Sequence, residues 1–276
     1  MAGHRHLRPP AVAGYGRPRP GCYTPSVPKV SVTVITLNEA ANLAAALESV
    51  RWADEIVVVD SGSTDDTVAI ARRYTDRVIE TGWPGYVAQK NFAAAQATYD
   101  WIFSLDADER VSEPLAAELH AVLAHDPVPA GYRVPRVTFH LGRWIRTTDW
   151  YPDAQLRLYD RRRARWTGRL VHESVAADGE VGQLRAELQH YAYRDIAHHL
   201  RTMDRYTTLA SRQMFEDGRR ASWPELLVHP AAAFLRNYLL RGGVTDGVPG
   251  LVISLMNSVY VGLKYAKLWE LCSLST

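Results

Sequence analysis

Two aspartates placed two positions apart, Asp106 and Asp108, directly follow the apolar run at residues 101–105. Because side chains alternate along an extended chain, both carboxylates project from the same side. Two neighbouring carboxylates repel each other, so we expect the pKa of one to rise and a positive charge to lie between them. Paired oxygen ligands of this kind suit Mg²⁺ or Mn²⁺, which can bridge carboxylates to a diphosphate and act as a Lewis acid on a leaving phosphate oxygen.

Strands and helices alternate through the first half of the chain. Apolar and β-branched runs predict strands at residues 29–37, 54–60, 77–80 and 100–106 and helices at residues 38–50, 67–74, 87–98 and 112–125. Asn38 and Ser112 are the candidate N-caps of the first and last of these helices. This alternation predicts an α/β fold with a mainly parallel sheet covered on both faces.

Two further acidic residues follow the first two predicted strands. Glu39 comes just after the first strand and Asp60 ends the second. Ligands of open α/β sheets bind outside the carboxyl ends of the strands, so these side chains and the aspartate pair should share one rim. No G-x-G-x-x-G follows the first strand and no G-x-x-x-x-G-K-[ST] occurs, which argues against a dinucleotide-binding fold and a P-loop.

Four segments together resemble inverting glycosyltransferase family 2, which has the GT-A nucleotide-diphospho-sugar transferase fold. They are TVITLNEAANL at 33–43, VVVDSGSTDDT at 57–67, QKN at 89–91 and SLDADE at 104–109, and the resemblance covers residues 30–125. It implies a nucleotide-diphosphate sugar donor. By this resemblance the donor site comprises Thr36, Asn38 and Glu39 at the nucleoside, Asp60 at the base, Lys90 near the nucleotide, and Asp106 and Asp108 at the metal.

An inverting transfer needs a base that takes the proton of the acceptor hydroxyl. The acidic-pair motif that many family members carry is missing, but DWYPDAQLRLYDRR at 149–162 and WTGRLVHESV at 166–175 resemble a subgroup that includes lipopolysaccharide-core β-1,4-glucosyltransferases. That resemblance implies Glu173 as the base, supported by His172. Asp149 and Asp153 are the rival bases, and a surface salt-bridge pair is the alternative interpretation of His172 and Glu173.

Other side chains in the second half are open to two interpretations. Arg157 either contacts the diphosphate or an anionic acceptor, or it is a strand-surface arginine. Trp150 and Tyr151 either stack on an acceptor sugar or belong to the core. Adjacent histidines on a helix point about 100° apart. We therefore interpret three histidines as structural or solvated rather than metal-binding: His190, His198 and His199.

The sequence predicts three regions: a disordered basic tail at residues 1–28, a GT-A catalytic domain at 29–194, and a helical C-terminal extension at 195–276. The last region has no stretch of about 20 uninterrupted apolar residues, which argues against a spanning helix. Prolines and glycines, Pro230 and Pro249 among them, should interrupt it.

Basic side chains beside aromatic ones suggest that the C-terminal region lies in a membrane interface, with core packing or a dimer contact as the alternatives. The basic residues concerned are Arg236, Arg241, Lys264 and Lys267.

The composition, net charge and cysteine count indicate the kind of protein and its cellular compartment. Apolar residues make up 47% of the chain and charged residues 22%, which suits a packed core. A formal charge of +2 gives no indication of a nucleic-acid partner. The two cysteines lie near opposite ends, and the first residues lack the apolar segment of a secretory signal. These features favour a reducing, cytoplasmic location.

The resulting prediction is a metal-dependent enzyme, peripheral on the inner face of the cell membrane. It would move a sugar, glucose from UDP-glucose by the subgroup resemblance, to a glycolipid or cell-envelope polysaccharide such as lipopolysaccharide core. The alternatives are a nucleotidyltransferase on a similar fold and a catalytically silent, sugar-nucleotide-binding membrane scaffold.

Overall fold

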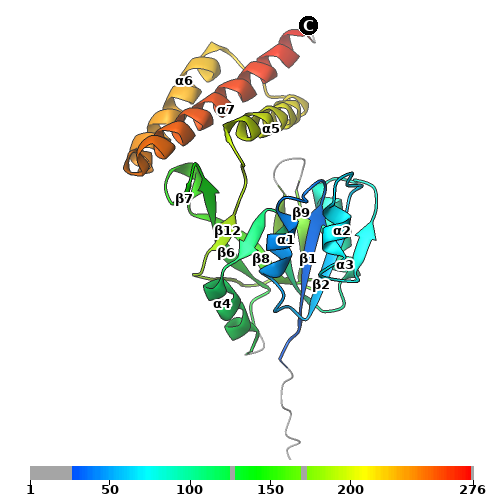
Figure 1. The fold of residues 1–276 in the computed structure, drawn as a ribbon. Coiled ribbons are helices and arrows are strands. Elements are labelled where there is room, and N and C mark those ends of the chain that lie inside the picture. The colour runs from blue at the N-terminus through cyan, green and yellow to red at the C-terminus, as the bar shows by residue number, and fades with distance from the viewer. Residues whose placement is uncertain (1–26, 125–127, 169–172, 275–276) are drawn as a thin grey trace, which may run out of the picture.

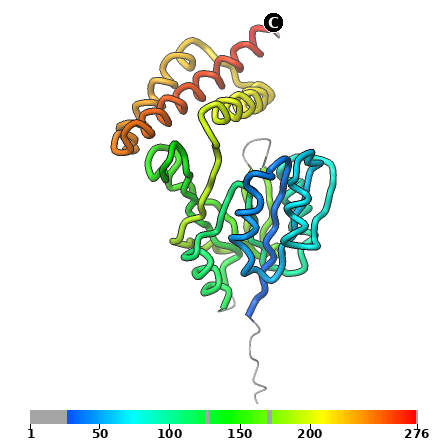
Figure 2. The backbone as a smooth tube through the Cα atoms, viewed as in Figure 1, coloured from blue at the N-terminus to red at the C-terminus, as the bar shows by residue number. Residues whose placement is uncertain are grey.

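The computed structural model describes residues 27–124, 128–168 and 173–274, so nearly all of the predicted N-terminal tail lies outside the described residues. The chain forms a sheet with flanking helices and, at the opposite end from the N-terminus, a layer of three long helices (Figure 1). These are α5 (Ile196–Glu216), α6 (Trp223–Leu235) and α7 (Gly247–Leu274). Figure 2 traces the single extended segment that joins β12 (Leu188–His190) to α5.

The main sheet has ten strands and contains both parallel and antiparallel pairs. The four predicted strands lie side by side and parallel, in the order β3 (Val78–Glu80), β2 (Glu55–Asp60), β1 (Val30–Thr36) and β4 (Trp101–Asp106). The order continues through β8 (Asp153–Asp160), β6 (Gly131–His140), β12 and β5 (Glu109–Val111), with antiparallel pairing except between β6 and β12. The predicted mixed GT-A sheet is confirmed.

Smaller strands complete the second half of the catalytic domain. β7 (Arg143–Ile145) and β11 (Val181–Gln183) pair with β6. β9 (Ala164–Thr167) and β10 (Ser174–Ala177) form a separate two-stranded sheet on either side of the segment that contains His172. A short 3₁₀ helix, η1 (Thr148–Trp150), precedes β8.

Helices cover both faces of the parallel strands, as the alternation predicts. Val57 and Val59 of β2 pack with Ala93 of α3 (Tyr86–Gln96) on one face. On the other face, Val34 of β1 belongs to the large core cluster with Leu47 of α1 (Leu43–Glu48). The remaining helices of this domain are α2 (Thr67–Ala71) and α4 (Glu113–Leu123).

The two predicted helix caps have different outcomes. Ser112 caps α4, and its Oγ accepts a bond from the Leu115 amide at 3.3 Å. Asn38 is not an N-cap: α1 begins later, after Asn42, and Asn38 has a left-handed φ of 56°. Asparagine tolerates that conformation because its side chain bonds locally. Here the Asn38 side-chain oxygen accepts a bond from the Thr64 amide at 2.8 Å.

The last C-terminal helix is not interrupted as the sequence predicted. α7 is a single helix of 28 residues. Pro249 does not interrupt it because it lies in the first turn, where no backbone N–H is needed. Residues Gly243–Leu274 are long and apolar enough to cross a membrane, a test that core helices of soluble proteins also pass. The expected interruption at Pro249 is therefore wrong, while the expectation that no helix crosses a membrane stays a prediction. Pro230 lies inside α6, which continues into a π-helical turn, η2 (Arg236–Leu240).

Asp149 joins the catalytic domain to the C-terminal helices. Its Oδ2 accepts bonds from Arg236 Nη2 at 2.5 Å, Asn237 Nδ2 at 3.0 Å and Asn257 Nδ2 at 3.1 Å. Its Oδ1 lies 3.0 Å from Arg241 Nε. Carboxylate oxygens that accept several charged and amide donors make some of the stronger hydrogen bonds in proteins. Asp149 therefore holds residues from η1, η2 and α7 together.

The four basic residues expected at a membrane interface have partners within the protein. Arg236 and Arg241 pair with Asp149. Lys267 Nζ lies 2.7 Å from Asp204 Oδ1 on α5. Lys264 is half-buried, with its Nζ 5.1 Å from the centre of the Tyr265 ring. These contacts pack the helices together, and the membrane interface that the sequence suggested for these residues stays a prediction.

Candidate functional site

A cleft of about 640 Å³ opens at the carboxyl ends of β1 and β4. Its walls come from these strands, from α3, from the β9–β10 pair and from the facing side of α5. The predicted site residues that line it are Thr36, Glu39, Lys90, Asp106, Asp108, Arg157 and Glu173. The sheet edge thus collects side chains from distant parts of the sequence, as expected for a ligand site in this kind of fold.

Asp106 is paired with two cations of the protein. Lys90 Nζ lies 2.9 Å from its Oδ1, and Arg157 Nη2 lies 2.6 Å from its Oδ2. Burial raises the pKa of Asp106, but the charges of Arg157 and Lys90 outweigh it and hold that pKa well below its usual range. A positive charge does lie beside the aspartate pair, and in this structure the protein supplies it.

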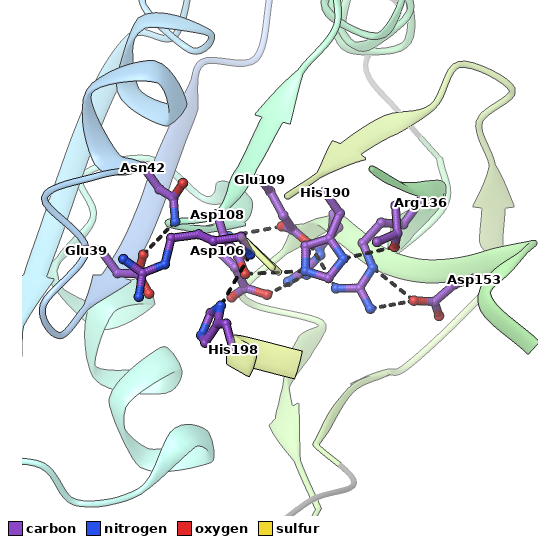
Figure 3. A network of polar contacts seen from close by, with 12 residues as sticks. Glu39, Asn42, Asp106, Asp108, Glu109, Arg136, Asp153, His190 and His198 are labelled. Atoms are coloured by element: carbon purple, nitrogen blue, oxygen red, sulfur yellow. Dashed lines mark hydrogen bonds and ion pairs between the residues drawn. The ribbon is translucent and has the colours of Figure 1, made fainter. Parts of the chain in front are cut away.

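Asp108 faces His190, whose Nε2 lies 3.4 Å from Asp108 Oδ2 (Figure 3). β12 pairs antiparallel with β5, with His190 opposite Glu109, and this register brings the imidazole to the aspartate. Burial raises the pKa of Asp108, but the nearby His190 lowers it by more, so the pKa is lowered overall. The expectation that one carboxylate of the pair has a raised pKa is wrong, because each has a basic partner.

His190, which we interpreted as structural or solvated, lies at the site. His190 lines the cleft. Its Nδ1 lies 3.2 Å from Thr138 Oγ1, which leaves Nε2 directed at Asp108. No local signal could have placed it there, because only the pairing of β12 with β5 and β6 brings it to the rim.

Arg157 is buried beneath the aspartates, so the interpretation as a strand-surface arginine is wrong. Its side chain is 3% exposed, and its Nη2 contacts both Asp106 and Glu109. Glu109 is fully buried and also pairs with Arg136 Nη1 at 3.0 Å. Arg136 in turn bonds Asp153, in the network that Figure 3 shows. Arg157 thus fixes the position of Asp106; its contact with a diphosphate stays a prediction.

The residues predicted at the nucleoside lie in two layers. Thr36 and Glu39 line the cleft. Asp60 is 1% exposed and accepts bonds from the amides of Gly62 and Ser63 at 2.9 and 2.8 Å and from Thr36 Oγ1 at 2.9 Å. These bonds hold the turn after β2, and Asp60 itself is not among the residues that line the cleft. Its contact with a base stays a prediction.

Asn38 and Glu39 differ in their surroundings. Asn38 is exposed and bonds Thr64 across the turn, outside the lining of the cleft. Glu39 accepts a bond from Asn42 Nδ2 at 3.0 Å. Burial raises the pKa of Glu39, and the nearby charge of Asp108 raises it further. A buried carboxylate beside another one adds negative potential to the cleft, which favours a cation there.

Glu173 lies at the side of the cleft formed by β9 and β10 and is partly exposed. His172 lies outside the described residues, so its predicted support of Glu173 stays a prediction. The rival bases are occupied: Asp149 has four partners in the C-terminal helices, and Asp153 is ion-paired with Arg136 and accepts a bond from Gln155. Of these three carboxylates, Glu173 alone lines the cleft.

The remaining predicted residues lie outside the lining of the large cleft. Trp150 packs among rings, 5.6 Å from Tyr193 and from His199 between ring centres. Tyr151 faces Glu187, which raises its pKa after burial does. His198 and His199 begin α5, with His199 buried. Among the described residues no group of three or more His, Cys, Asp or Glu side chains could hold a metal ion.

The sequence profile described as "Glycosyl transferase family 2" matches residues 31–177. The chain belongs to this family. It is 34% identical to the lipopolysaccharide core biosynthesis glycosyltransferase LpsC of Rhizobium meliloti (strain 1021), over 88% of this chain and 94% of that protein. It is 30% identical to an uncharacterized glycosyltransferase of Rickettsia felis, over 88% of this chain and 90% of that protein.

A solved structure shares the fold over nearly the whole length. The mannosyltransferase PcManGT from Pyrobaculum calidifontis, solved with GDP-Man and Mn²⁺, aligns with a TM-score of 0.54 and 18% identity over 89% of this chain and 88% of that one. The chain is therefore a family 2 glycosyltransferase with a GT-A-like sheet and a C-terminal helical extension. Family membership argues against the nucleotidyltransferase alternative, since the two classes share only the nucleotide-binding sheet.

Proposed function

We propose that this protein is an inverting glycosyltransferase that moves a sugar from a nucleotide diphosphate, with a divalent cation at Asp108, to a hydroxyl of a glycolipid. The single observation that carries the proposal is the pair formed by Asp108 and His190 at 3.4 Å on the rim of the cleft. The carboxylate suits Mn²⁺ or Mg²⁺, which take further ligands from phosphate oxygens and water, and the imidazole nitrogen is a better ligand for Mn²⁺ than for the harder Mg²⁺.

The residues of the site fit such a cation. Asp108 and His190 would hold it, and the cation would neutralise charge on the leaving diphosphate. Both carboxylate oxygens of Asp106 are already paired with cations of the protein. Asp106 would therefore be a weaker ligand of the cation than Asp108. This modifies the expectation that Asp106 and Asp108 share the metal equally. Two protein ligands also agree with the absence of a larger cluster among the described residues.

Glu173 is the base in this proposal. It takes the proton of the acceptor hydroxyl while the hydroxyl oxygen bonds the anomeric carbon and the bond to the diphosphate breaks. The product has the opposite anomeric configuration, and the nucleoside diphosphate leaves. Lys90 lies beside Asp106 with its Nζ 4.2 Å from the centre of the Trp166 ring, where it can meet negative charge on the departing group.

The donor and acceptor follow from the resemblances. UDP-glucose is the proposed donor by the likeness of residues 149–175 to the core glucosyltransferase subgroup. Lipopolysaccharide core is the proposed acceptor, supported by the 34% identity to LpsC.

The membrane face of the proposal has support from exposed apolar side chains. Several lie on or between α6 and α7, among them Trp223, Leu227, Leu239, Leu240, Val244 and Val248 at exposures of 49–83%. We propose that α7 lies along the inner membrane surface and does not cross it. Crossing would break the bonds of Asn257 to Asp149 and of Lys267 to Asp204, which tie α7 to the rest of the protein.

Calorimetric titration with UDP-glucose, UDP-galactose, UDP-N-acetylglucosamine and GDP-mannose, with and without Mn²⁺, tests the donor. We expect metal-dependent binding of one sugar nucleotide, and product analysis with rough lipopolysaccharide should detect a released nucleoside diphosphate. Release of pyrophosphate would indicate nucleotidyl transfer. Binding with no turnover on any saccharide would favour the silent scaffold.

A further inference from the structure

A second cavity, of about 230 Å³, lies between α5, α7 and η1. It is lined by Trp150, Tyr193, His199, Thr202, Met203, Tyr206, Ile253, Met256, Asn257 and Tyr260. Tyr193 and Tyr206 line both this cavity and the large cleft, so the two spaces are neighbours separated by these side chains. We call it the α5–α7 cavity.

Aromatic rings dominate its walls. Tyr193 stacks on His199 with ring centres 4.0 Å apart and 16° between planes. Trp150 lies 5.6 Å from Tyr193, and Tyr206 and Tyr260 close other sides. Rigid aromatic faces with a few polar groups are typical of small-ligand sites, and at 230 Å³ the cavity is below the roughly 300–1,000 Å³ of pockets for drug-sized ligands. It suits one small ring.

Polar groups within the walls require a polar occupant. His199 is 4% exposed, and its Nδ1 has no hydrogen-bond partner among the described residues. A buried polar atom left without a partner costs about 1–3 kcal/mol, which a ligand hydroxyl would recover. Asn257 and Thr202 add amide and hydroxyl groups to the same walls. The Asn257 Nδ2 already bonds Asp149, but an acyl chain would leave His199 Nδ1 unpaired, so a sugar fits better.

The cavity is next to the proposed base. Glu173 and Tyr206 both line the large cleft, and Tyr206 also lines the α5–α7 cavity. A ring in the α5–α7 cavity would therefore lie across Tyr206 from the cleft that contains Glu173. This is the relation that an acceptor must have to a base and a donor.

We propose that the α5–α7 cavity binds a pyranose ring of the acceptor, stacked on the aromatic walls and hydrogen-bonded to His199 and Asn257. The inference rests on the proposed transferase function and names its acceptor subsite. It also explains the position of α7: the same helix contributes Asn257 and Tyr260 to the cavity and presents apolar side chains to the surface, which suits an acceptor sugar attached to a lipid.

Saturation-transfer NMR with methyl glycosides tests the subsite. The probes are methyl β-D-glucopyranoside, methyl β-D-galactopyranoside and methyl α-D-mannopyranoside, each with the protein loaded with UDP and diamagnetic Mg²⁺. We expect transfer to at least one glycoside with wild type. Thr202→Trp, which fills the cavity, should reduce the transfer by about tenfold or more. His199→Phe, which keeps the ring but lacks both nitrogens, should also reduce it.

Glu216→Trp on the exposed end of α5 is the matched control and should retain wild-type saturation transfer. Circular dichroism and thermal melting check that each variant is folded. Calorimetric binding of UDP-glucose with Mn²⁺ reads the donor site separately and should be unchanged in Thr202→Trp. The subsite is overturned if wild type shows no transfer to any glycoside, or if Thr202→Trp keeps it. Failure of wild type to bind any sugar nucleotide would instead overturn the proposed function.

Discussion

His190 Nε2 lies 3.4 Å from Asp108 Oδ2, because the last residue of β12 is opposite the first residue of β5 in the sheet. The strand pairing thus places an imidazole beside a carboxylate at the mouth of the cleft. The neighbouring Asp106 is already neutralised by Lys90 and Arg157. The two aspartates of the motif therefore have different partners: Asp106 pairs with two cations of the protein and Asp108 with one histidine.

Asp108→Asn should abolish metal-dependent donor binding while the fold is kept. The amide keeps the shape but loses the charge that attracts a divalent cation. His190→Ala should weaken Mn²⁺-dependent binding by about tenfold or more. Titration calorimetry with the sugar nucleotide and Mn²⁺ measures both. Asp76→Asn, an exposed position away from the cleft, is the control. Unchanged affinity and metal dependence in Asp108→Asn would show that the metal lies elsewhere.

Glu173→Gln should leave donor affinity unchanged and lower kcat by roughly 10²–10⁴-fold, the usual effect of losing a general base. Glutamine keeps the size of the side chain but cannot accept the proton. Single-turnover kinetics separate this chemical step from product release. Glu180→Gln, an exposed neighbour on the same part of the chain, should behave as wild type. Near-normal turnover of Glu173→Gln would return the role to Asp149 or Asp153.

The strand ends were the part of the site that the sequence could predict. Asp106 and Asp108 follow a buried strand, and an apolar run with an acidic end is a local signal. Glu39 follows the first predicted strand in the same way, Lys90 came with the family resemblance, and both line the cleft. His190 could not be found in this way, because the pairing of two three-residue strands brings it to the rim.

The helical region shows a second limit of sequence reasoning. Pro249 was expected to interrupt a helix. In the first turn of a helix, however, proline is well tolerated, because the backbone N–H groups there have no partner within the helix. Arg236 and Arg241 looked like membrane anchors, since composition cannot show that Asp149 would meet them across the fold. Local sequence patterns therefore predicted the helices and strands. They could not predict the contacts between elements that are far apart in the sequence.

Asp149→Ala should loosen the C-terminal helices. The change leaves Arg236, Asn237 and Asn257 without their shared acceptor, and Asn237 is fully buried. We expect a loss of about 1–3 kcal/mol in the free energy of unfolding. Hydrogen exchange should become faster in α6 and α7 than in the main sheet.

Asp204→Ala is the matched control for the Asp149 prediction, because it also removes one carboxylate that pairs with these helices. Its side chain is 77% exposed, so the loss should stay below about 1 kcal/mol. Equal effects of the two changes, or exchange that rises uniformly over the protein, would contradict the assignment of Asp149 as the main link.

His199 should make stability fall as the pH decreases from 6.5 towards 4. Burial, together with smaller contributions from the nearby His140 and His198, lowers the pKa of His199 from 6.5 to about 4. The unfolded chain then binds more protons than the folded one in this window, so stability is complete above pH 6.5 and is lost below it. The loss should reach about 2–3 kcal/mol near pH 4.

Urea unfolding at several pH values measures this pH dependence. Other groups also titrate in the window, so the informative quantity is the difference between wild type and His199→Phe. The free energy of unfolding of wild type minus that of His199→Phe should decrease steadily as the pH falls through the window. His229→Phe, at an exposed position of α6, should follow wild type at every pH. Parallel curves for wild type and His199→Phe would refute the prediction.

The apolar side chains around the turn between α6 and α7 should bind the protein to membranes. Leu239, Leu240 and Val248 are 56%, 83% and 72% exposed, and burying a leucine or valine is worth about 1.5–3 kcal/mol. Replacing all three with Gln should therefore release the protein from liposomes in a flotation assay. Because Arg236, Arg241 and Lys267 are paired within the protein, high salt should weaken binding only in part.

The control is the double variant Val27→Gln/Val128→Gln, which changes two exposed apolar positions on the catalytic domain and should float like wild type. Wild-type protein that stays in the soluble fraction with both neutral and anionic liposomes would mean that this apolar surface meets another protein chain, and the glycolipid acceptor would lose its support from the helices.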